Sequence, residues 1–251
     1  MDDLRRIIGL YDIHTPDNIP LDGVIKFIRD FKPTHLVNGG DFLHLESIRE
    51  LAKKQHIDVG TMEVTRAINE LKKEFAGAND ILDKIDAALP KECTKIFLEG
   101  NHEYWLRQII EIAPTQKPIF DPRLNLRLTE RGYSWVPMNK TANIGRLYFA
   151  HGIYTNKYHA AKTLSIYQRN IVYGHCHTHQ VFTSSSPIDD EGKTAIAVPC
   201  LCGPGAYMRG RPSSWINGFF VAYSDPKTNF FWPYIVTMIR NRFISPDGKS
   251  Y

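Results

Sequence analysis

The chain lacks any apolar stretch long enough to cross a membrane. No window approaches the roughly 18 uninterrupted apolar residues that such a span needs. The longest run, residues 230–239, contains Pro233. Residues 1–6 place two aspartates and two arginines directly before an apolar run, which leaves no room for a secretory leader. We therefore expect a soluble, cytoplasmic protein with no membrane partner.

Cysteine is scarce, and its placement excludes two further classes of protein. The sequence holds four, at Cys93, Cys176, Cys200 and Cys202. They have neither the dense spacing of a disulfide scaffold nor the C-x-x-C pairs of a structural zinc site. We expect reduced and mostly buried thiols.

Internal repeats, low-complexity tracts and linkers are also missing. A length of 251 residues suits one α/β domain with a sizeable core, so we expect a single domain over residues 1–251. Short apolar runs alternate with longer amphipathic stretches, which is typical of strands alternating with helices. Five strands are predicted at residues 6–11, 35–38, 94–98, 147–150 and 170–173. Three more, at residues 194–198, 219–223 and 230–236, make the C-terminal third β-rich and predict a second sheet there.

A long charged segment, about residues 46–89, separates the second strand from the third. Its apolar residues recur at alternating steps of three and four, which predicts a helix. They are Val64, Ile68, Leu71, Phe75, Ala78, Leu82, Ile85 and Leu89. This apolar face either packs on the sheet or forms a homodimer through the helix, and Gly77 and Asn79 are places where the helix could break in two.

Potential metal ligands follow each of the first five strands at once. They are Asp12 with His14, Asp41, Asn101 with His102, His151, and His175 with His177. The loops at the carboxyl ends of strands form the ligand crevice of α/β folds, so these five segments should converge on one site. Residues two apart in extended backbone point to the same side, which lets each Asp-x-His or His-x-His pair bind one ion.

The ordered set resembles the signature of the calcineurin-like metallophosphoesterases, which is D-x-H, G-D, G-N-H-[DE], H and G-H-x-H. This chain reads Asp12-Ile13-His14, Gly40-Asp41, Gly100-Asn101-His102-Glu103, His151-Gly152 and Gly174-His175-Cys176-His177. The resemblance implies an α/β fold with a two-sheet β-sandwich flanked by helices. It also implies that Asp12, His14, Asp41 and His177 hold one metal, and that Asp41, Asn101, His151 and His175 hold the other.

Two such ions can clamp a phosphoryl group and convert a bridging water into a hydroxide nucleophile. Imidazole ligands favour manganese, iron, zinc or nickel over magnesium and calcium, and we expect manganese first. By the same resemblance, His102 is the general acid that protonates the leaving oxygen. Arg107, about one helical turn further on, is a candidate for binding the substrate phosphate or is a surface residue.

The second motif departs from that of the protein phosphatases in the superfamily, which read G-D-x-V-D-R-G. Here the sequence is Gly40-Asp41-Phe42-Leu43-His44, without the arginine and the second aspartate. The G-D-x-x-H spacing resembles the double-strand-break repair nucleases instead, which makes His44 a second catalytic candidate. Alternatively, His44 is a helix-start residue with no role.

The basic excess is local, because the last 51 residues hold six Lys and Arg against two Asp, while the whole chain has a net charge of +4. The six are Arg209, Arg211, Lys227, Arg240, Arg242 and Lys249. Aromatic residues lie among them, at Tyr207, Trp215, Phe230, Phe231 and Trp232. This composition suits either contact with a nucleic acid or a solvated surface. Our first hypothesis is a phosphodiesterase or nuclease, our second a phosphomonoesterase of small nucleotides, and our third a non-catalytic scaffold.

Overall fold

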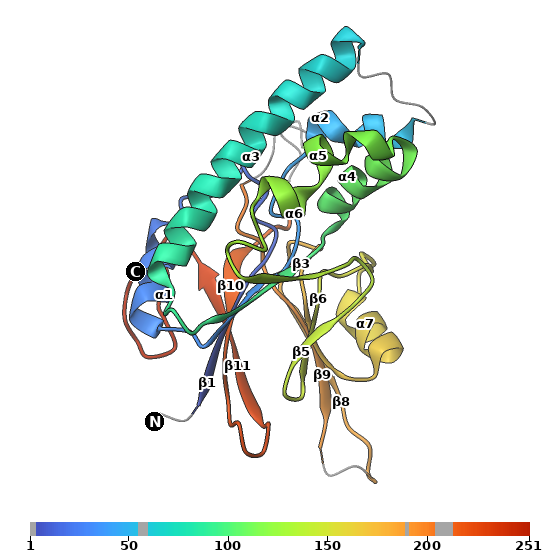
Figure 1. Cartoon of the computed structure of the whole chain (residues 1–251). Helices are drawn as coiled ribbons and strands as arrows, with labels where there is room; N and C mark the ends of the chain where they lie inside the picture. Colours follow the sequence, from blue (N-terminus) through green and yellow to red (C-terminus); the bar gives the residue numbers. More distant parts are fainter. Residues whose placement is uncertain (1–3, 55–59, 189–190, 204–212) are drawn as a thin grey trace.

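The computed structural model describes residues 4–54, 60–188, 191–203 and 213–251. Two sheets lie face to face, with helices over their outer faces (Figure 1). No helix in the described ranges is long and apolar enough to span a membrane. The architecture is the α/β fold that the sequence predicts, a two-sheet sandwich flanked by helices in a single domain.

The first sheet has the strand order β11-β10-β1-β2-β3-β4. Its strands are β1 (Arg5–Leu10), β2 (His35–Asn38), β3 (Thr94–Leu98), β4 (Tyr133–Val136), β10 (Asn217–Ser224) and β11 (Phe231–Met238). Strands β1 to β4 are parallel, whereas β10 pairs antiparallel with β1. The carboxyl ends of β1, β2 and β3 therefore lie side by side at one edge of the sandwich.

The second sheet has the order β5-β6-β7-β9-β8. Its strands are β5 (Ala142–Ile144), β6 (Leu147–Ala150), β7 (Asn170–Tyr173), β8 (Gln180–Ser184) and β9 (Lys193–Ala197). Strands β6, β7 and β9 are parallel, so the loops after β6 and β7 also leave from one edge.

The side chains of each strand point alternately to the two faces of the sheet, and this explains how the layers pack. In β1, Ile7 packs between the sheets with Phe149 and Val172, while its neighbour Ile8 belongs to the core under the helices. Successive side chains of a strand point to opposite faces, so a strand buried on both faces is apolar at every position. This is the reason that the central strands are continuous apolar runs.

The helices cover both outer faces. They are α1 (Asp22–Phe31), α2 (Glu46–Arg49), α3 (Met62–Ala88), α4 (Asn101–Ile112), α5 (Lys117–Phe120), α6 (Pro122–Asn125) and α7 (His159–Tyr167). Two 3-10 turns join them, at Leu51–Lys53 and Pro114–Gln116. On the second sheet, Ala160 and Leu164 of α7 pack on Ile171 and Tyr173 of β7.

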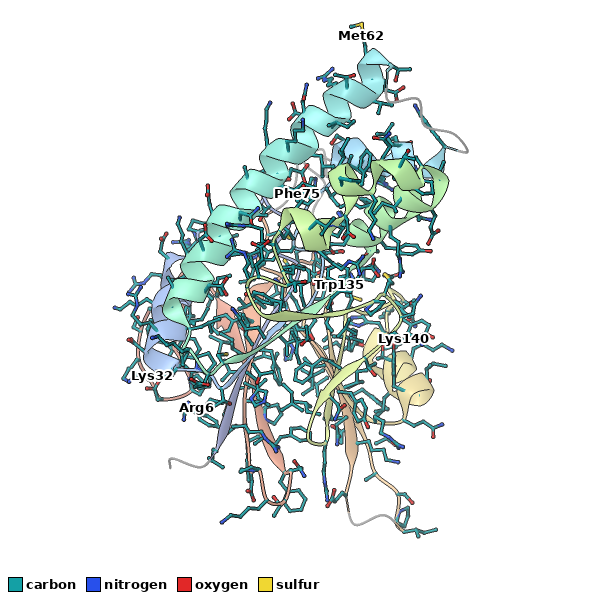
Figure 2. The ribbon with its side chains drawn as sticks, in the orientation of Figure 1. Arg6, Lys32, Met62, Phe75, Trp135 and Lys140 are labelled. Carbon is teal, nitrogen blue, oxygen red and sulfur yellow. The ribbon has the colours of Figure 1, made fainter. Side chains whose placement is uncertain are left out.

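Helix α3 is continuous over 27 residues and passes through Gly77 and Asn79 without a break. Thr61 starts it by accepting a hydrogen bond from Val64 N, and the amide of Asn79 donates to Phe75 O and Asn125 O at 2.9 Å each. Its upper end, marked by the exposed Met62, extends past the sheets in Figure 2.

The predicted apolar face of α3 is buried within the chain. Its residues in the core include Val64, Leu71, Phe75, Leu82 and Ile85. The alternative in which this face packs inside the domain is therefore the one observed. A homodimer through the helix stays a prediction.

Four strands, β2, β3, β6 and β7, begin and end where the sequence predicts. The prediction of a separate C-terminal sheet is wrong, because β10 and β11 join the first sheet while β8 and β9 join the second. Antiparallel pairing of β10 with β1 joins the two ends of the chain, which a local pattern does not reveal. Strands β4, β5 and β8 were not predicted.

We predict that Gly77→Ala raises the free energy of unfolding by about 0.5–1 kcal/mol, because alanine is the better residue inside a helix. A Cβ at this position would meet Thr15 Cγ2 at 3.5 Å, an ordinary van der Waals distance. Urea unfolding measures the change. Gly39→Ala is the matched contrast, since its Cβ would lie 1.9 Å from Tyr11 Cδ1 and overpacking of this kind costs about 1–3 kcal/mol. A loss of stability in Gly77→Ala would contradict the prediction.

Candidate metal centre

Loops from both sheets bring five of the predicted ligands together, in two overlapping groups. One nitrogen or oxygen from each of Asp12, His14 and Asp41 lies within 4.8 Å of the others, and the same holds for Asp41, His151 and His175. Asp41 belongs to both groups. Asp12, His14 and Asp41 follow strands of the first sheet, whereas His151 and His175 follow strands of the second.

The first group extends to His177. Its Nε2 lies 3.5 Å from Asp12 Oδ1 and 3.2 Å from His14 Nε2. His14 Nε2 in turn lies 3.9 Å from Asp41 Oδ2. Two ligand atoms bound to one ion at about 2.0–2.2 Å are roughly 3.0–3.5 Å apart. The separations in this group are close to those of atoms that share a cation.

The second group extends to Asn101. His151 Nε2 lies 3.3 Å from Asp41 Oδ2 and 3.0 Å from Asn101 Oδ1. The ring of His175 stands edge-on to that of His151, with 5.2 Å between centroids. Asp41 Oδ2 therefore faces the histidines of both groups, which is the position that a bridging ligand requires.

Each aspartate has one oxygen satisfied by the backbone and the other turned toward the histidines. Asp12 Oδ2 accepts from His175 N at 2.8 Å, and Asp41 Oδ1 accepts from His102 N at 2.9 Å. Asp12 Oδ1 is buried without a hydrogen-bond partner among the described residues. A buried carboxylate oxygen left in this way is costly unless a cation binds it. The donor set and this oxygen are suited to binding metal ions, and the two groups are candidates for holding them.

The backbone at the site is strained. Five of the seven proposed ligands have a left-handed φ, namely Asp12 (51°), His14 (51°), Asp41 (50°), His175 (70°) and His177 (57°). Left-handed backbone is uncommon outside glycine, and strain of this kind concentrates at functional sites. Gly100 permits the closest approach, because a Cβ there would lie 2.1 Å from Asp41 Oδ1.

The charges of the two aspartates explain the pKa values of the histidines around them. Burial disfavours a charged His151, but attraction by Asp41 outweighs burial and raises the pKa of His151 to about 9. In the same way, Asp12 outweighs burial and raises the pKa of His177 to about 10. Burial lowers the pKa of His14 well below its ordinary value. A cation that binds here replaces the protons on His151 and His177, so binding releases protons and weakens at low pH.

The carboxylate of Glu103 ties two of the loops together. One oxygen accepts from Asp41 N and Gly100 N, at 2.9 and 3.0 Å, and the other from Phe42 N and Leu43 N, at 2.8 and 3.1 Å. Glu103 is fully buried. Burial and the charge of Asp41 raise its pKa to about 7, against the backbone donors, which favour the carboxylate.

His102 and His44 lie beside the first group. His102 Nδ1 donates to the backbone carbonyl of His44, and His102 Nε2 lies 3.8 Å from Asp41 Oδ2. A carbonyl only accepts, so the proton sits on Nδ1 and Nε2 is the nitrogen that faces the site. The carbonyl of His44 thus orients the ring of His102. Asp17 lies 3.6 Å from His44 Nε2.

Arg107 is engaged elsewhere. Its guanidinium lies 3.1 Å from Glu99 Oε2 and over the ring of Tyr104, 4.6 Å from the centroid. A role for Arg107 in substrate binding stays a prediction.

Sequence reasoning missed several neighbours of the site. Cys202 Sγ lies 3.7 Å from His177 Nδ1, and the ring of Trp215 stands 4.2 Å from that of His177. The four cysteines are free, and three of them are buried. Glu103 is the last residue of the G-N-H-[DE] motif. That position was the one signal in the sequence that pointed to its importance.

No family model matches the chain, and no curated protein matches it. Among solved structures, a crystal structure of wild-type Vps29 complexed with Zn²⁺, from Entamoeba histolytica, is similar with 12% identity and a TM-score of 0.47. That alignment covers 98% of this chain and 97% of the other. A second crystal structure has 13% identity and a TM-score of 0.39 over 92% of this chain and 99% of the other.

We predict that Glu103→Gln lowers the free energy of unfolding, because an NH₂ group then faces two backbone N–H donors. Each buried group that loses its partner costs about 1–3 kcal/mol. The control is Glu92→Gln at an exposed position, which should change little. Denaturant unfolding of both variants makes the comparison, and equal stability would show that Glu103 does not hold the loops.

Proposed function

We propose that this chain is a dinuclear metal-dependent phosphoesterase of the calcineurin-like kind, with phosphodiesters as the preferred substrates. The observation that carries the proposal is the pair of ligand groups that share Asp41. The motif order of the sequence supports the same conclusion independently. Imidazole-rich ligands favour manganese first, and iron, zinc or nickel next.

The charge of the centre suits an anionic substrate. Bound ions would supply an activated water and stabilise charge on the phosphoryl oxygens. The proposed ligands contribute two carboxylates, Asp12 and Asp41, and otherwise neutral imidazoles and an amide. Two dications would leave such a site net positive, which attracts a phosphate and favours a transition state that gains negative charge.

His102 is our candidate for the general acid. Its Nε2 faces the site beside Asp41, and its Nδ1 is held by the His44 carbonyl. The ring also packs against Trp105, with 4.2 Å between centroids. A ring fixed at two points would present Nε2 to the leaving oxygen of a substrate. Burial lowers the pKa of His102, and the negative charge of Asp41 partly offsets that effect.

The preference for a diester rests on the second motif. A monoester dianion benefits from an additional cation such as the phosphatase arginine, whereas a diester carries one charge and needs it less. In this chain Leu45 stands at the motif position of the arginine, and His44, beside Asp17, stands at that of the second aspartate. The basic C-terminal residues support a nucleic-acid substrate only in part. Arg209 and Arg211 lie outside the described residues.

The remaining cations do not form one surface. Lys227 lies in the turn before β11 and Arg240 in the turn after it. The strand between them separates these turns by roughly 25 Å. Lys227 therefore does not belong to the same basic surface as Arg240.

We predict that Asp41→Ala abolishes turnover and lowers metal content, because it removes the ligand common to both groups. His102→Ala should keep two ions and lose about 10²–10⁴-fold in kcat, as loss of an acid catalyst does. Elemental analysis and steady-state kinetics measure the two effects, and His35→Ala at the far end of β2 is the control. Full activity of His102→Ala on a substrate with a poor leaving group would remove its proposed role.

We also predict that diesters are hydrolysed in preference to monoesters. The comparison is kcat/KM on bis-p-nitrophenyl phosphate and p-nitrophenyl phosphate, each divided by its uncatalysed rate. Single-stranded and double-stranded DNA then follow at two salt concentrations, since contact with several phosphates makes binding fall steeply with salt. A monoester preference with no DNA cleavage at low salt would support a nucleotide phosphatase instead.

A further inference from the structure

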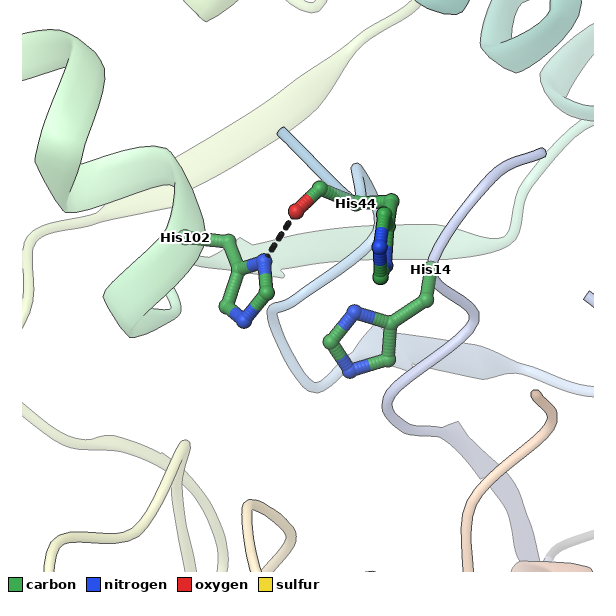
Figure 3. Close-up of side chains that lie close together, drawn as sticks. All are labelled: His14, His44 and His102. Atoms are coloured by element: carbon green, nitrogen blue, oxygen red, sulfur yellow. Dashed lines mark hydrogen bonds between the residues drawn. The ribbon is translucent and has the colours of Figure 1, made fainter. Parts of the chain in front are cut away.

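Three histidines form a cluster beside the two ligand groups, and two of them are outside the proposed metal set. His14, His44 and His102 each offer one nitrogen within 4.8 Å of the others. They come from the loop after β1, the loop after β2 and the start of α4, and Figure 3 shows the three rings gathered together.

Two of these rings have an acceptor behind them. The carbonyl of His44 accepts from His102 Nδ1, and the carboxylate of Asp17 lies 3.6 Å from His44 Nε2. Histidines that bind metals almost always donate their other ring N–H to a carboxylate or a backbone carbonyl. His102 therefore has the outer partner of a metal ligand, and His44 has a carboxylate close to the corresponding position.

The third ring, that of His14, has a buried nitrogen without a hydrogen-bond partner among the described residues. The His14 side chain is 5% exposed, and its Nδ1 is buried with no hydrogen-bond partner among the described residues. Its Nε2 faces His177 and Asp41, so the nitrogen on the other side of the ring is the one without a partner.

The ring separations are close to those around a common ion. Imidazoles bound at about 2.0–2.1 Å place their centroids roughly 4.5–5.5 Å apart for angles between a right angle and a trigonal one. The centroids of His14 and His102, 4.6 Å apart, lie within this range. Those of His14 and His44, 5.7 Å apart, and of His44 and His102, 6.0 Å apart, are slightly farther apart, so the ring of His44 would have to move inward by a few tenths of an ångström.

We propose that His14, His44 and His102 form a third transition-metal site, which binds Zn²⁺ and inhibits the enzyme when it is filled. Three histidine nitrogens are a common ligand set for zinc. The inhibition, but not the binding, rests on the proposed function, because zinc on His102 Nε2 takes away the nitrogen that would donate a proton to the leaving oxygen.

The third site is weaker than the dinuclear centre. It shares His14 with that centre, and two dications already bound nearby repel a third. Use of His14 Nδ1 also requires the loss of the proton on that ring. The site therefore fills last, at zinc concentrations above those that load the other two ions.

The test counts zinc in the metal-free full chain by calorimetric titration and elemental analysis. The wild type should bind three equivalents, the last more weakly than the first two. His44→Ala should bind two, and it keeps the backbone carbonyl that orients His102. Asp17→Asn should weaken the third step alone, by about 10–100-fold, as loss of an outer partner does. His35→Ala is the control and should bind three.

Excess zinc should lower the rate of wild-type diester hydrolysis, while the residual rate of His44→Ala should not fall further. Two equivalents in the wild type, or a third of equal affinity in His44→Ala, would overturn the proposal. An inactive protein that still binds a third, His44-dependent zinc would refute the proposed function and keep the site. An active protein that binds only two equivalents of zinc would refute the third site and leave the proposed function standing.

Discussion

The hydrogen bonds of one buried carboxylate, that of Glu103, determine whether the loops after β2 and β3 can meet. Its oxygens accept four backbone N–H groups from the two loops, and those loops carry Asp41, Asn101 and His102. A carboxylate has enough lone pairs for all four donors, whereas an amide has not. The close approach also requires Gly100, where any side chain would collide with Asp41. The rest of the site follows from this arrangement.

Several energetically unfavourable features lie among the proposed metal ligands. The left-handed backbone at Asp12, His14 and Asp41, and the orphaned oxygen of Asp12, each cost free energy in the folded chain. Packing elsewhere offsets them, since the strands beneath are apolar on both faces. Strained backbone of this kind persists only where the surrounding structure holds it in place, and it is typical of functional sites.

The features of the fold that depend on a local sequence pattern could be predicted. Strands such as β2 and β3 contain short apolar runs, and potential ligands follow within a few residues of each strand. The ends of these elements and the convergence of the loops were therefore both predictable. Strand β8 was not, because most of its residues are exposed and it lacks a buried face. The pairing of β10 with β1, and the contact of His44 with His14, join segments far apart in the chain. Only the three-dimensional structure reveals contacts of that kind.

The centre takes ligands from both layers of the sandwich, Asp12 and Asp41 from the first sheet and His151 and His175 from the second. Ions bound there would cross-link the two sheets at one edge. Anything that binds the folded chain alone stabilises it by mass action, by about 2.7 kcal/mol at a hundredfold excess over the dissociation constant. The thermal stability of this protein would then report the free metal concentration around it, and a chelator would act as a mild denaturant.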